Sequence, residues 1–510
     1  MHLATIQANL AHPLMHRARN DPDRIALIFE NEKYSYRDFG LSVMRLAALL
    51  KENGVCVGDR VGFIGFNHPA FLQTLFAANA IGAVFVPLNF RLTAPELTYI
   101  INDAGVHTLI CDAEMQISIE PVRGDLYCQN YFVVSETLSD WRCLQEECKR
   151  VEPLDNLLSV QQHDTSLIMY TSGTTGLPKG AMLSHGNLMW NNFNCMVGFN
   201  TSNEDVSLMA APLFHIGGLN VVTLLSFMQG ATLVLMAKFD AGQVLQAFDQ
   251  HKITVMYGAP AMFLFMSQHE LFAATDFSRV NYFVCGGAAA SESLLKLYTN
   301  RGVSICQGYG STETAPFSSL LTARWSMRKI GSSGQAPMYT DLKIVDSSNE
   351  PLRAREKGEI CVKGPNVMQG YWNNPDATAK AIDGEGWYHS GDIGYLDDEG
   401  FLYICDRLTD MVISGGENVY PAEVESVLAE HEAIAEVAVL GTPHEKWGEA
   451  VTAVVVLHQG YALDLEDLRS FADGQLARYK LPLCLHIFDE LPRNPAGKVL
   501  KFVLKEWLGF

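Results

Sequence analysis

The stretch that decides the fold is Tyr170-Thr-Ser-Gly-Thr-Thr-Gly-Leu-Pro-Lys-Gly180, which follows the short apolar run Ser166–Tyr170. An apolar run of this length beside glycine is typical of a buried strand. Because glycine has no Cβ, three glycines in the loop allow backbone amides to converge on an anion. The hydroxyl side chains add neutral donors, and Lys179 adds a positive charge. The stretch therefore predicts a loop that holds a polyphosphate.

The loop differs from a Walker A motif, in which Gly-Lys-Ser/Thr runs into a helix. Here Lys179 follows Pro178 and precedes Gly180, so we expect the lysine to lie on a turn. A Ser/Thr/Gly surface loop has a similar composition, but the order of residues resembles the phosphate-binding signature of the adenylate-forming superfamily. That superfamily contains acyl-CoA synthetases, adenylation domains of peptide synthetases and luciferases. The resemblance implies contacts to the phosphates of ATP from Thr171, Ser172, Gly173, Thr174, Thr175, Gly176 and Lys179, with Thr174 also near the metal.

A second motif, Gln307-Gly-Tyr-Gly-Ser-Thr-Glu-Thr314, resembles the next signature of the superfamily. The resemblance implies that Tyr309 stacks on adenine, that Thr312 contacts phosphate and that Glu313 helps to hold Mg²⁺, with Gln307, Gly308 and Gly310 beside the nucleotide. A flat ring suits a purine face, and a hard cation binds carboxylate and phosphate oxygens. Taken alone, the motif could also be a glycine-rich turn followed by a helix cap.

Two further motifs lie in the order that the resemblance predicts. In Trp387-Tyr-His-Ser-Gly-Asp392, Asp392 would bind the ribose hydroxyls, although Ser-Gly-Asp alone would be an ordinary turn. In the segment 406–425, Arg407 would contact ribose or phosphate. The loop 414–418, with Gly415 and Gly416, would line the pantetheine tunnel in the thioester-forming state. Glu423 and Glu425 in this segment suit a helix N-terminus better than catalysis.

The fifth motif is Pro492-Arg-Asn-Pro-Ala-Gly-Lys498. The resemblance implies that Lys498 bridges the substrate carboxylate and the α-phosphate. Attack of a carboxylate on a phosphate joins two anions, so a mobile cation there is chemically reasonable. Outside this context, an exposed lysine after a glycine turn would be the simpler interpretation.

The acid side of the site is predicted from two segments. Ala211-Pro-Leu-Phe-His-Ile-Gly-Gly218 resembles the segment whose histidine flanks the acyl pocket. We expect His215 to act as a gate there, because a carboxylate needs no general base at neutral pH. Gly217 and Gly218 would leave space for the substrate beside it. In the segment 285–289, Gly287 and Ala288 would supply backbone near adenine and a wall of the acyl pocket.

Composition limits the function. A net charge of −20 in 510 residues argues against a nucleic-acid surface. No stretch approaches 18 consecutive apolar residues, so no membrane span is expected. The N-terminus lacks the features of a secretory signal, and the eleven cysteines are scattered without CxxC pairs. We therefore expect a cytoplasmic enzyme.

The chain is too long for a single core. Apolar strands alternate with helices up to about residue 330, which predicts doubly wound parallel sheets. Short strands with glycine turns follow from 340 and suggest an antiparallel, barrel-like part. The expectation is an α/β protein with an N-terminal domain at 1–405, a hinge at 406–410 and a mobile α+β domain at 411–510.

Together these features predict an acyl-CoA synthetase that uses ATP, Mg²⁺ and CoA. Thr409 stands at the hinge position, where relatives carry Asp or Lys, and its β-branch restricts rotation. This leaves open an amide ligase of the coronafacate-ligase type, which would use an amino acid as acceptor, or a loader of carrier proteins. An apolar aliphatic, alicyclic or aryl acid of moderate size is expected, bound by a monomer or homodimer.

Overall fold

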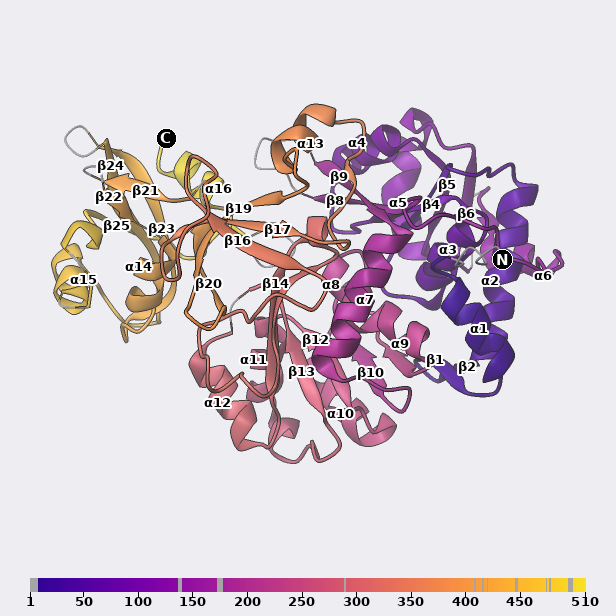
Figure 1. Cartoon of the computed structure of the whole chain (residues 1–510), viewed down its shortest axis with the longest axis horizontal. Helices are drawn as coiled ribbons and strands as arrows, with labels where there is room; N and C mark the ends of the chain where they lie inside the picture. The colour runs from indigo at the N-terminus through magenta and orange to yellow at the C-terminus, as the bar shows by residue number, and fades with distance from the viewer. Residues whose placement is uncertain are drawn as a thin grey trace. The chain divides into compact units, whose positions relative to one another are not determined.

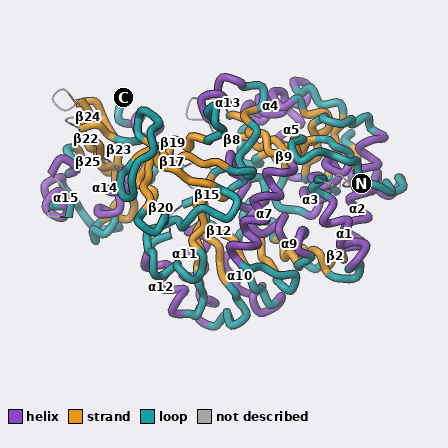
Figure 2. The backbone as a smooth tube through the Cα atoms, in the orientation of Figure 1, coloured by secondary structure: helices purple, strands orange, loops and turns teal. Residues whose placement is uncertain are grey.

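The computed structural model describes residues 8–135, 140–171, 178–288, 290–407, 410–414, 417–419, 421–444, 448–473, 475–476, 478–493 and 499–510. It forms two compact units (Figure 1). The first contains Met1–Leu342 and Val362–Tyr388, and the second contains Lys343–Cys361 and His389–Phe510. Strands and helices alternate along most of the first unit (Figure 2).

One eight-stranded sheet of the first unit has the order β15-β14-β13-β12-β10-β11-β1-β2. Its strands are β1 (Ile25–Phe29), β2 (Glu32–Ser35), β10 (Val206–Met209), β11 (Thr232–Leu235), β12 (Val255–Gly258), β13 (Tyr282–Cys285), β14 (Ile305–Gly310) and β15 (Phe317–Leu321). The central pairs are parallel, whereas β2 and β15 pair antiparallel to their neighbours. The carboxyl ends of β10, β12, β13 and β14 therefore lie along one edge, where ligands bind in open α/β sheets.

The other eight-stranded sheet has the order β18-β9-β8-β4-β3-β5-β6-β7. Its strands are β3 (Arg60–Ile64), β4 (Val84–Leu88), β5 (Val106–Cys111), β6 (Asn130–Val133), β7 (Arg142–Cys143), β8 (Thr165–Thr171), β9 (Lys179–Ser184) and β18 (Gly370–Tyr371). The strands β3 to β6 pair in parallel, and β8 and β9 form an antiparallel hairpin around the signature loop.

The helices of the first unit connect and cover these strands. They are α1 (His12–Asn20), α2 (Tyr36–Glu52), α3 (Pro69–Ala80), α4 (Ala94–Ala104), α5 (Ala113–Ile119), α6 (Leu144–Lys149), α7 (His185–Phe199), α8 (Ile216–Gly218), α9 (Leu224–Gln229), α10 (Ala241–His251), α11 (Pro260–Gln268), α12 (Glu292–Asn300) and α13 (Pro375–Ala381). The sequence explains several starts. Ser35 caps α2 by accepting from the Asp38 amide at 3.1 Å, as its position before the helix predicts. Thr93 and Glu96 form a capping box at α4.

The second unit contains two smaller sheets. The first has the order β16-β17-β19-β20, from β16 (Asp341–Val345), β17 (Gly358–Lys363), β19 (Tyr388–Leu396) and β20 (Leu402–Arg407). The second contains β21 (Val412–Ser414), β22 (Glu417–Val419), β23 (Ile434–His444), β24 (Gly448–Leu457) and β25 (Cys484–Ile487). Helices α14 (Pro421–Leu428), α15 (Leu465–Ala472) and α16 (Lys501–Trp507) accompany them. The core around β23, β24 and α14 is made of Val, Leu, Ile and Ala side chains.

The structure confirms the α/β class, with parallel sheets in a large N-terminal part and a smaller C-terminal part. One local expectation is wrong: Lys179 does not lie on a turn but is the first residue of β9, paired with Thr171. The pairing of β9 with β8 begins directly after Pro178, so Lys179 is already part of the strand. The predicted hinge at 406–410 remains a prediction, since Leu408 and Thr409 lie outside the described residues. Among the described helices, none combines the length and apolarity needed to cross a bilayer.

Candidate active site

The signature hairpin places Lys179 beside Tyr371, whose hydroxyl binds a buried carboxylate. Strand β18 pairs antiparallel with β9, so Gly370 and Tyr371 lie next to the lysine's strand. The Lys179 Nζ atom lies 5.4 Å from the centroid of the Tyr371 ring. The Tyr371 hydroxyl donates to Glu313 Oε1 at 2.9 Å. The fold thus brings together Lys179 and Glu313, which are 134 positions apart, through a tyrosine that the sequence motifs do not include.

Glu313 is held firmly in this position. It lies in the 3-10 helix η4 (Thr312–Thr314), directly after β14, and is 8% exposed. Its backbone carbonyl accepts from the Met368 amide at 2.8 Å. Burial, followed by the negative charge of Glu313, raises the pKa of Tyr371 well above its ordinary value. Tyr371 is therefore a hydrogen-bond donor throughout the physiological range, and its donation fixes one oxygen of the carboxylate.

Glycines in β14 determine which way Tyr309 faces. A Cβ on Gly308 would lie 2.1 Å from the Phe317 ring, and a Cβ on Gly310 would lie 1.7 Å from the Pro316 carbonyl oxygen. The face of β14 that carries Gly308 and Gly310 is therefore closed by β15 and the turn before it. Since side chains alternate along a strand, Gln307 and Tyr309 share the opposite face. Tyr309 is half-buried there.

Gln307 connects this strand to the next predicted segment. It is paired with Cys285 of β13, and its Oε1 atom accepts from the Ala290 amide at 3.3 Å. Gly287, in a left-handed conformation with φ of 87°, and Ala288 lie in the same β13–α12 connection. The adenine and acyl-wall residues predicted from two separate motifs are thus neighbours at the carboxyl edge of one sheet.

His215 lies at the same edge, just before α8. Its Nε2 atom is buried and has no hydrogen-bond partner among the described residues. Burial, with a smaller effect from the positive charge of Arg91, lowers the pKa of His215 to about 4. The imidazole is therefore neutral at pH 7. A neutral imidazole can accept or donate a hydrogen bond, and the gate role stays a prediction.

Tyr257, at the end of β12, lies between the two acid-side segments and belongs to none of the sequence motifs. A Cβ on Gly217 would lie 2.1 Å from the Tyr257 hydroxyl oxygen, and one on Gly286 would lie 3.3 Å from its ring. The glycines at these positions therefore make space for a buried aromatic ring. The sequence predicts that Gly217 and Gly218 leave space for substrate, whereas the structure fills part of that space with Tyr257.

In the second unit, Asp392 and Arg407 are register partners in the antiparallel pair β19–β20. The Asp392 amide donates to Ser390 Oγ at 3.1 Å, and the Gly391 amide donates to Glu359 Oε1 at 3.0 Å. Ser390, Gly391 and Asp392 lie within strand β19, not in a turn, and side chains of β17 and β19 hold this part of the strand. Glu423 and Glu425 form ion pairs with Lys480 and Lys501, which agrees with a structural role.

Several predicted residues lie outside the described parts of the chain, and the structure does not place them. They are Ser172, Gly173, Thr174, Thr175, Gly176, Thr409, Gly415, Gly416 and Lys498. Of Arg407, the structure describes the backbone only.

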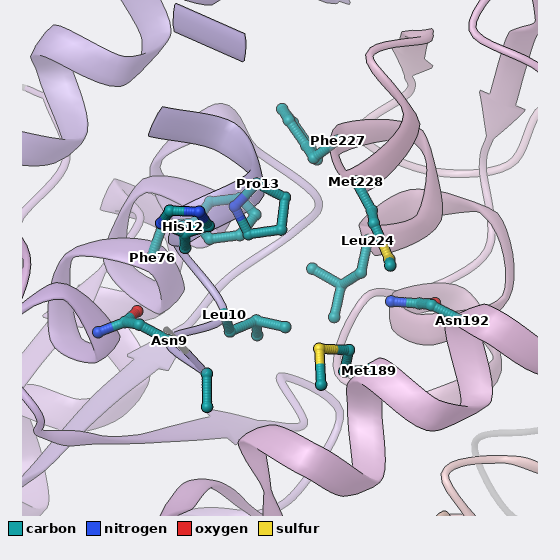
Figure 3. Close-up of a pocket in the computed structure, with 11 residues that line it drawn as sticks. Asn9, Leu10, His12, Pro13, Phe76, Met189, Asn192, Leu224, Phe227 and Met228 are labelled. Carbon is teal, nitrogen blue, oxygen red and sulfur yellow. The ribbon is translucent and has the colours of Figure 1, made fainter. Parts of the chain in front are cut away.

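An apolar pocket of about 90 Å³ in the first unit is separate from these residues. Figure 3 shows Leu10 from the N-terminal segment, Met189 from α7 and Leu224 from α9 pointing toward a common space. None of the predicted site residues lines it. It is smaller than the roughly 300 Å³ that small-molecule sites usually provide.

The comparisons with known proteins agree with this geometry. The family model described as AMP-binding enzyme matches residues 14–372, and the model described as AMP-binding enzyme C-terminal domain matches residues 423–498. The chain therefore belongs to the AMP-binding enzyme family, which confirms the resemblance to adenylate-forming enzymes.

Individual relatives match over nearly their whole length. The chain is 40% identical to feruloyl-CoA synthase of Amycolatopsis sp, over 97% of this chain and 98% of the relative. It is 39% identical to indoleacetate–CoA ligase of Aromatoleum aromaticum, over 94% of each. The structure is similar to o-succinylbenzoate CoA synthetase from Bacillus subtilis in complex with the acyl-adenylate intermediate, with a TM-score of 0.86, 33% identity and 97% of each chain covered.

Proposed function

We propose that this chain activates a carboxylic acid with ATP and Mg²⁺ as an acyl-adenylate, releasing pyrophosphate, and then transfers the acyl group to CoA. The observation that carries the proposal is the group of Lys179, Tyr371 and the buried Glu313, in which Lys179 is the first residue of β9 after the signature loop. A cation and a fixed carboxylate beside a glycine-rich loop suit a metal-bound polyphosphate. The CoA ligases among the relatives support the same chemistry.

In the first half-reaction, a carboxylate oxygen of the acid attacks the α-phosphorus, and the bond from that phosphorus to the bridging oxygen of pyrophosphate breaks. Mg²⁺ bound with ATP supplies neutralisation of phosphate charge. Glu313 would hold the ion, because Tyr371 occupies one of its oxygens and leaves the other for a cation. Lys179 would contact the phosphates as a point charge, with Thr174 and Thr175 of the loop beside it.

The adenosine contacts follow from the remaining motifs. Tyr309 would stack on adenine, because its ring lies on the face of β14 opposite to the one that Gly308 and Gly310 share and that the Phe317 ring and the Pro316 carbonyl close. Asp392 would accept hydrogen bonds from the ribose hydroxyls, and Arg407 would contact ribose or phosphate. Lys498 would stabilise the charge that develops as the carboxylate attacks.

In the second half-reaction, the CoA sulfur attacks the acyl carbon, and the bond between that carbon and the phosphate oxygen breaks to release AMP. The loop with Gly415 and Gly416 would line the path of the thiol. Relatives named as CoA ligases favour CoA as acceptor over an amino acid or a carrier protein.

We further propose that the acid is an aryl carboxylic acid. Feruloyl-CoA synthase, indoleacetate–CoA ligase and o-succinylbenzoate CoA synthetase are all named for acids that carry an aromatic ring. In this chain, the buried ring of Tyr257 lies between the His215 segment and the Gly286 segment, as one flat wall. A flat wall beside a neutral imidazole suits an aromatic ring through stacked or edge-to-face contacts.

A cytoplasmic location remains part of the proposal, since all eleven cysteines are free of disulfides in the structure. The deciding experiment incubates the enzyme with ATP, Mg²⁺ and a pool of aryl and aliphatic acids, with or without CoA and amino acids, followed by mass spectrometry. Aryl-CoA and AMP that form only with CoA are expected. Acyl-amino acids formed without CoA would instead identify an amide ligase, and exclusively aliphatic products would contradict the aryl acid.

A further inference from the structure

A group of three metal-ligating side chains lies in the second unit, apart from the residues assigned to Mg²⁺. Glu359 and Cys361 are two positions apart on β17, so their side chains share one face of the sheet. His389 projects from the neighbouring strand β19. The candidate ligand atoms of the three residues all lie within 4.8 Å of one another. We propose that Glu359, Cys361 and His389 form a binding site for a borderline-soft divalent cation, of which Zn²⁺ is the type.

The distances fit a zinc site with little rearrangement. His389 Nδ1 lies 2.9 Å from Glu359 Oε2 and 3.4 Å from Cys361 Sγ. Tetrahedral zinc with ordinary bonds to sulfur, nitrogen and oxygen holds its ligand atoms about 3.3 to 3.6 Å apart. The His389–Glu359 pair would have to open by about 0.5 Å and the His389–Cys361 pair by about 0.2 Å, while the ligand atoms of Cys361 and Glu359 lie within 4.8 Å of each other. Three protein ligands leave the fourth position to water.

The ligand set also selects the metal. A thiolate and an imidazole favour zinc over magnesium or calcium, which bind oxygen ligands. A thiolate and a carboxylate together balance the two positive charges of the ion. Cys361 is fully buried, while the side chains of His389 and Glu359 are about one-fifth exposed. An ion can therefore reach the two outer ligands first, and the sulfur closes the inner side of the site.

The site lies next to the part of strand β19 that carries Asp392. Glu359 uses its second oxygen, Oε1, to accept from the Gly391 amide at 3.0 Å, and Gly391 has a φ of 67°. Metal binding to Oε2 would thus restrain the carboxylate that holds the Gly391 amide of β19. If Asp392 binds the ribose, as proposed above, then zinc binding and nucleotide binding are linked. Bound zinc changes the affinity for nucleotide, and bound nucleotide changes the affinity for zinc by the same factor.

The binding experiment uses the full-length enzyme without nucleotide. Co²⁺ is titrated as a spectroscopic probe and Zn²⁺ as the competitor, into the wild type and Cys361→Ser. The wild type should show a thiolate-to-cobalt charge-transfer band that Zn²⁺ abolishes, and it should bind one more equivalent of Zn²⁺ than the variant. Cys484→Ser, which removes a cysteine outside the group, is the matched control and should behave as the wild type.

Loss of a direct ligand should weaken binding by more than the roughly 10- to 100-fold seen for an outer-shell partner. His389→Gln and Glu359→Gln provide the same test if Cys361→Ser fails to fold, which circular dichroism would show. Equal zinc stoichiometry and affinity in the wild type and the ligand variants, or a cobalt spectrum without the thiolate band, would overturn the site. An AMP affinity that zinc leaves unchanged in a zinc-loaded wild type would contradict the linkage to Asp392 and leave the metal site standing.

Discussion

At the scale of single residues, Glu313 is the most informative position. In Glu313→Gln, the amide oxygen can still accept from Tyr371, but the negative charge near the metal is lost. We expect ATP–pyrophosphate exchange to fall by about 100-fold or more, as when one preorganised electrostatic contact is removed. The fold should be retained, so the thermal midpoint should shift little. The measurement is isotope exchange at several Mg²⁺ concentrations.

Tyr371→Phe tests the hydrogen bond that positions Glu313, while the charge of Glu313 stays unchanged. The variant removes one hydroxyl and leaves the buried carboxylate without that donor, which costs about 1–3 kcal/mol. The expected result is a lower thermal midpoint with a smaller loss of exchange than in Glu313→Gln. An equal loss of exchange in both variants would show that Tyr371 does more than position the carboxylate, and a loss in neither would remove both residues from the site.

At the scale of elements, the close contact between β14 and the turn before β15 makes a stability prediction. A Cβ on Gly310 would lie 1.7 Å from a backbone oxygen, which cannot move without moving the turn. Gly310→Ala should therefore lower the free energy of unfolding by about 1–3 kcal/mol or more and reduce exchange with it. Gly384→Ala is the matched control, since a Cβ there meets no atom within 4 Å. Chemical denaturation would compare the two variants.

Two helix-associated histidines predict a pH dependence. His68 Nδ1 accepts from the Ala70 amide at 3.0 Å and caps α3, and His185 Nδ1 accepts from the Leu10 amide at 3.1 Å. Burial lowers the pKa of each to about 4, against an ordinary value of 6.5. The unfolded chain therefore binds more protons at these two positions between pH 4 and 6.5, so their contribution to stability should fall as the pH falls through this window and be complete above it.

Thermal midpoints measured from pH 4 to 8 would test this dependence. In His68→Asn, the side-chain oxygen keeps a cap acceptor that does not titrate. The slope below pH 6.5 should be shallower in this variant than in the wild type. A wild-type midpoint that is independent of pH down to 4 would contradict the neutral, buried state of both histidines.

The elements show what the sequence can and cannot predict. The sequence pattern alone predicts apolar strands at Val106–Cys111 and Tyr282–Cys285 and a short strand at Asp341–Val345, and β5, β13 and β16 have these limits. The sequence of residues 24–36 also predicts a strand, an Asn-Glu turn and a strand, and β1 and β2 form that hairpin. Tyr371 could not be found in this way, because its partner Glu313 lies 58 positions earlier and only the pairing of β18 with β9 brings the two together. Tyr257 could not be found from the sequence either, because its neighbours Gly217 and Gly286 are distant in the chain and only the fold brings them to its ring.

At the scale of the whole molecule, we expect the C-terminal segment to contribute a residue that only the first half-reaction needs. Lys498 belongs to the C-terminal family segment and lies outside the described residues. Lys498→Ala should abolish ATP–pyrophosphate exchange while sparing thioester formation from a presynthesised acyl-adenylate, because only the first step joins two anions. Lys505→Ala, on α16, is the control. Exchange that survives in Lys498→Ala would refute its role, and equal loss of both steps would indicate a general defect.

The division into compact units was only partly predictable. Composition and length indicate more than one core. The second compact unit begins in β16 and contains β20, and the expected domain boundary at 405 and hinge at 406–410 stay predictions. Compactness depends on which strands pair across the chain, and periodicity within a single strand carries no information about that pairing.

The hydrogen bond from Tyr371 to one oxygen of Glu313 has a consequence for ion discrimination. A carboxylate with one oxygen engaged offers a cation chiefly the other, and so favours monodentate ligation. Mg²⁺ accepts one such oxygen within an octahedron completed by phosphate and water, whereas Ca²⁺ takes six to eight ligands and often binds carboxylates through both oxygens. A single phenolic hydroxyl would therefore shift the preference of the site from calcium toward magnesium without any change in its charge.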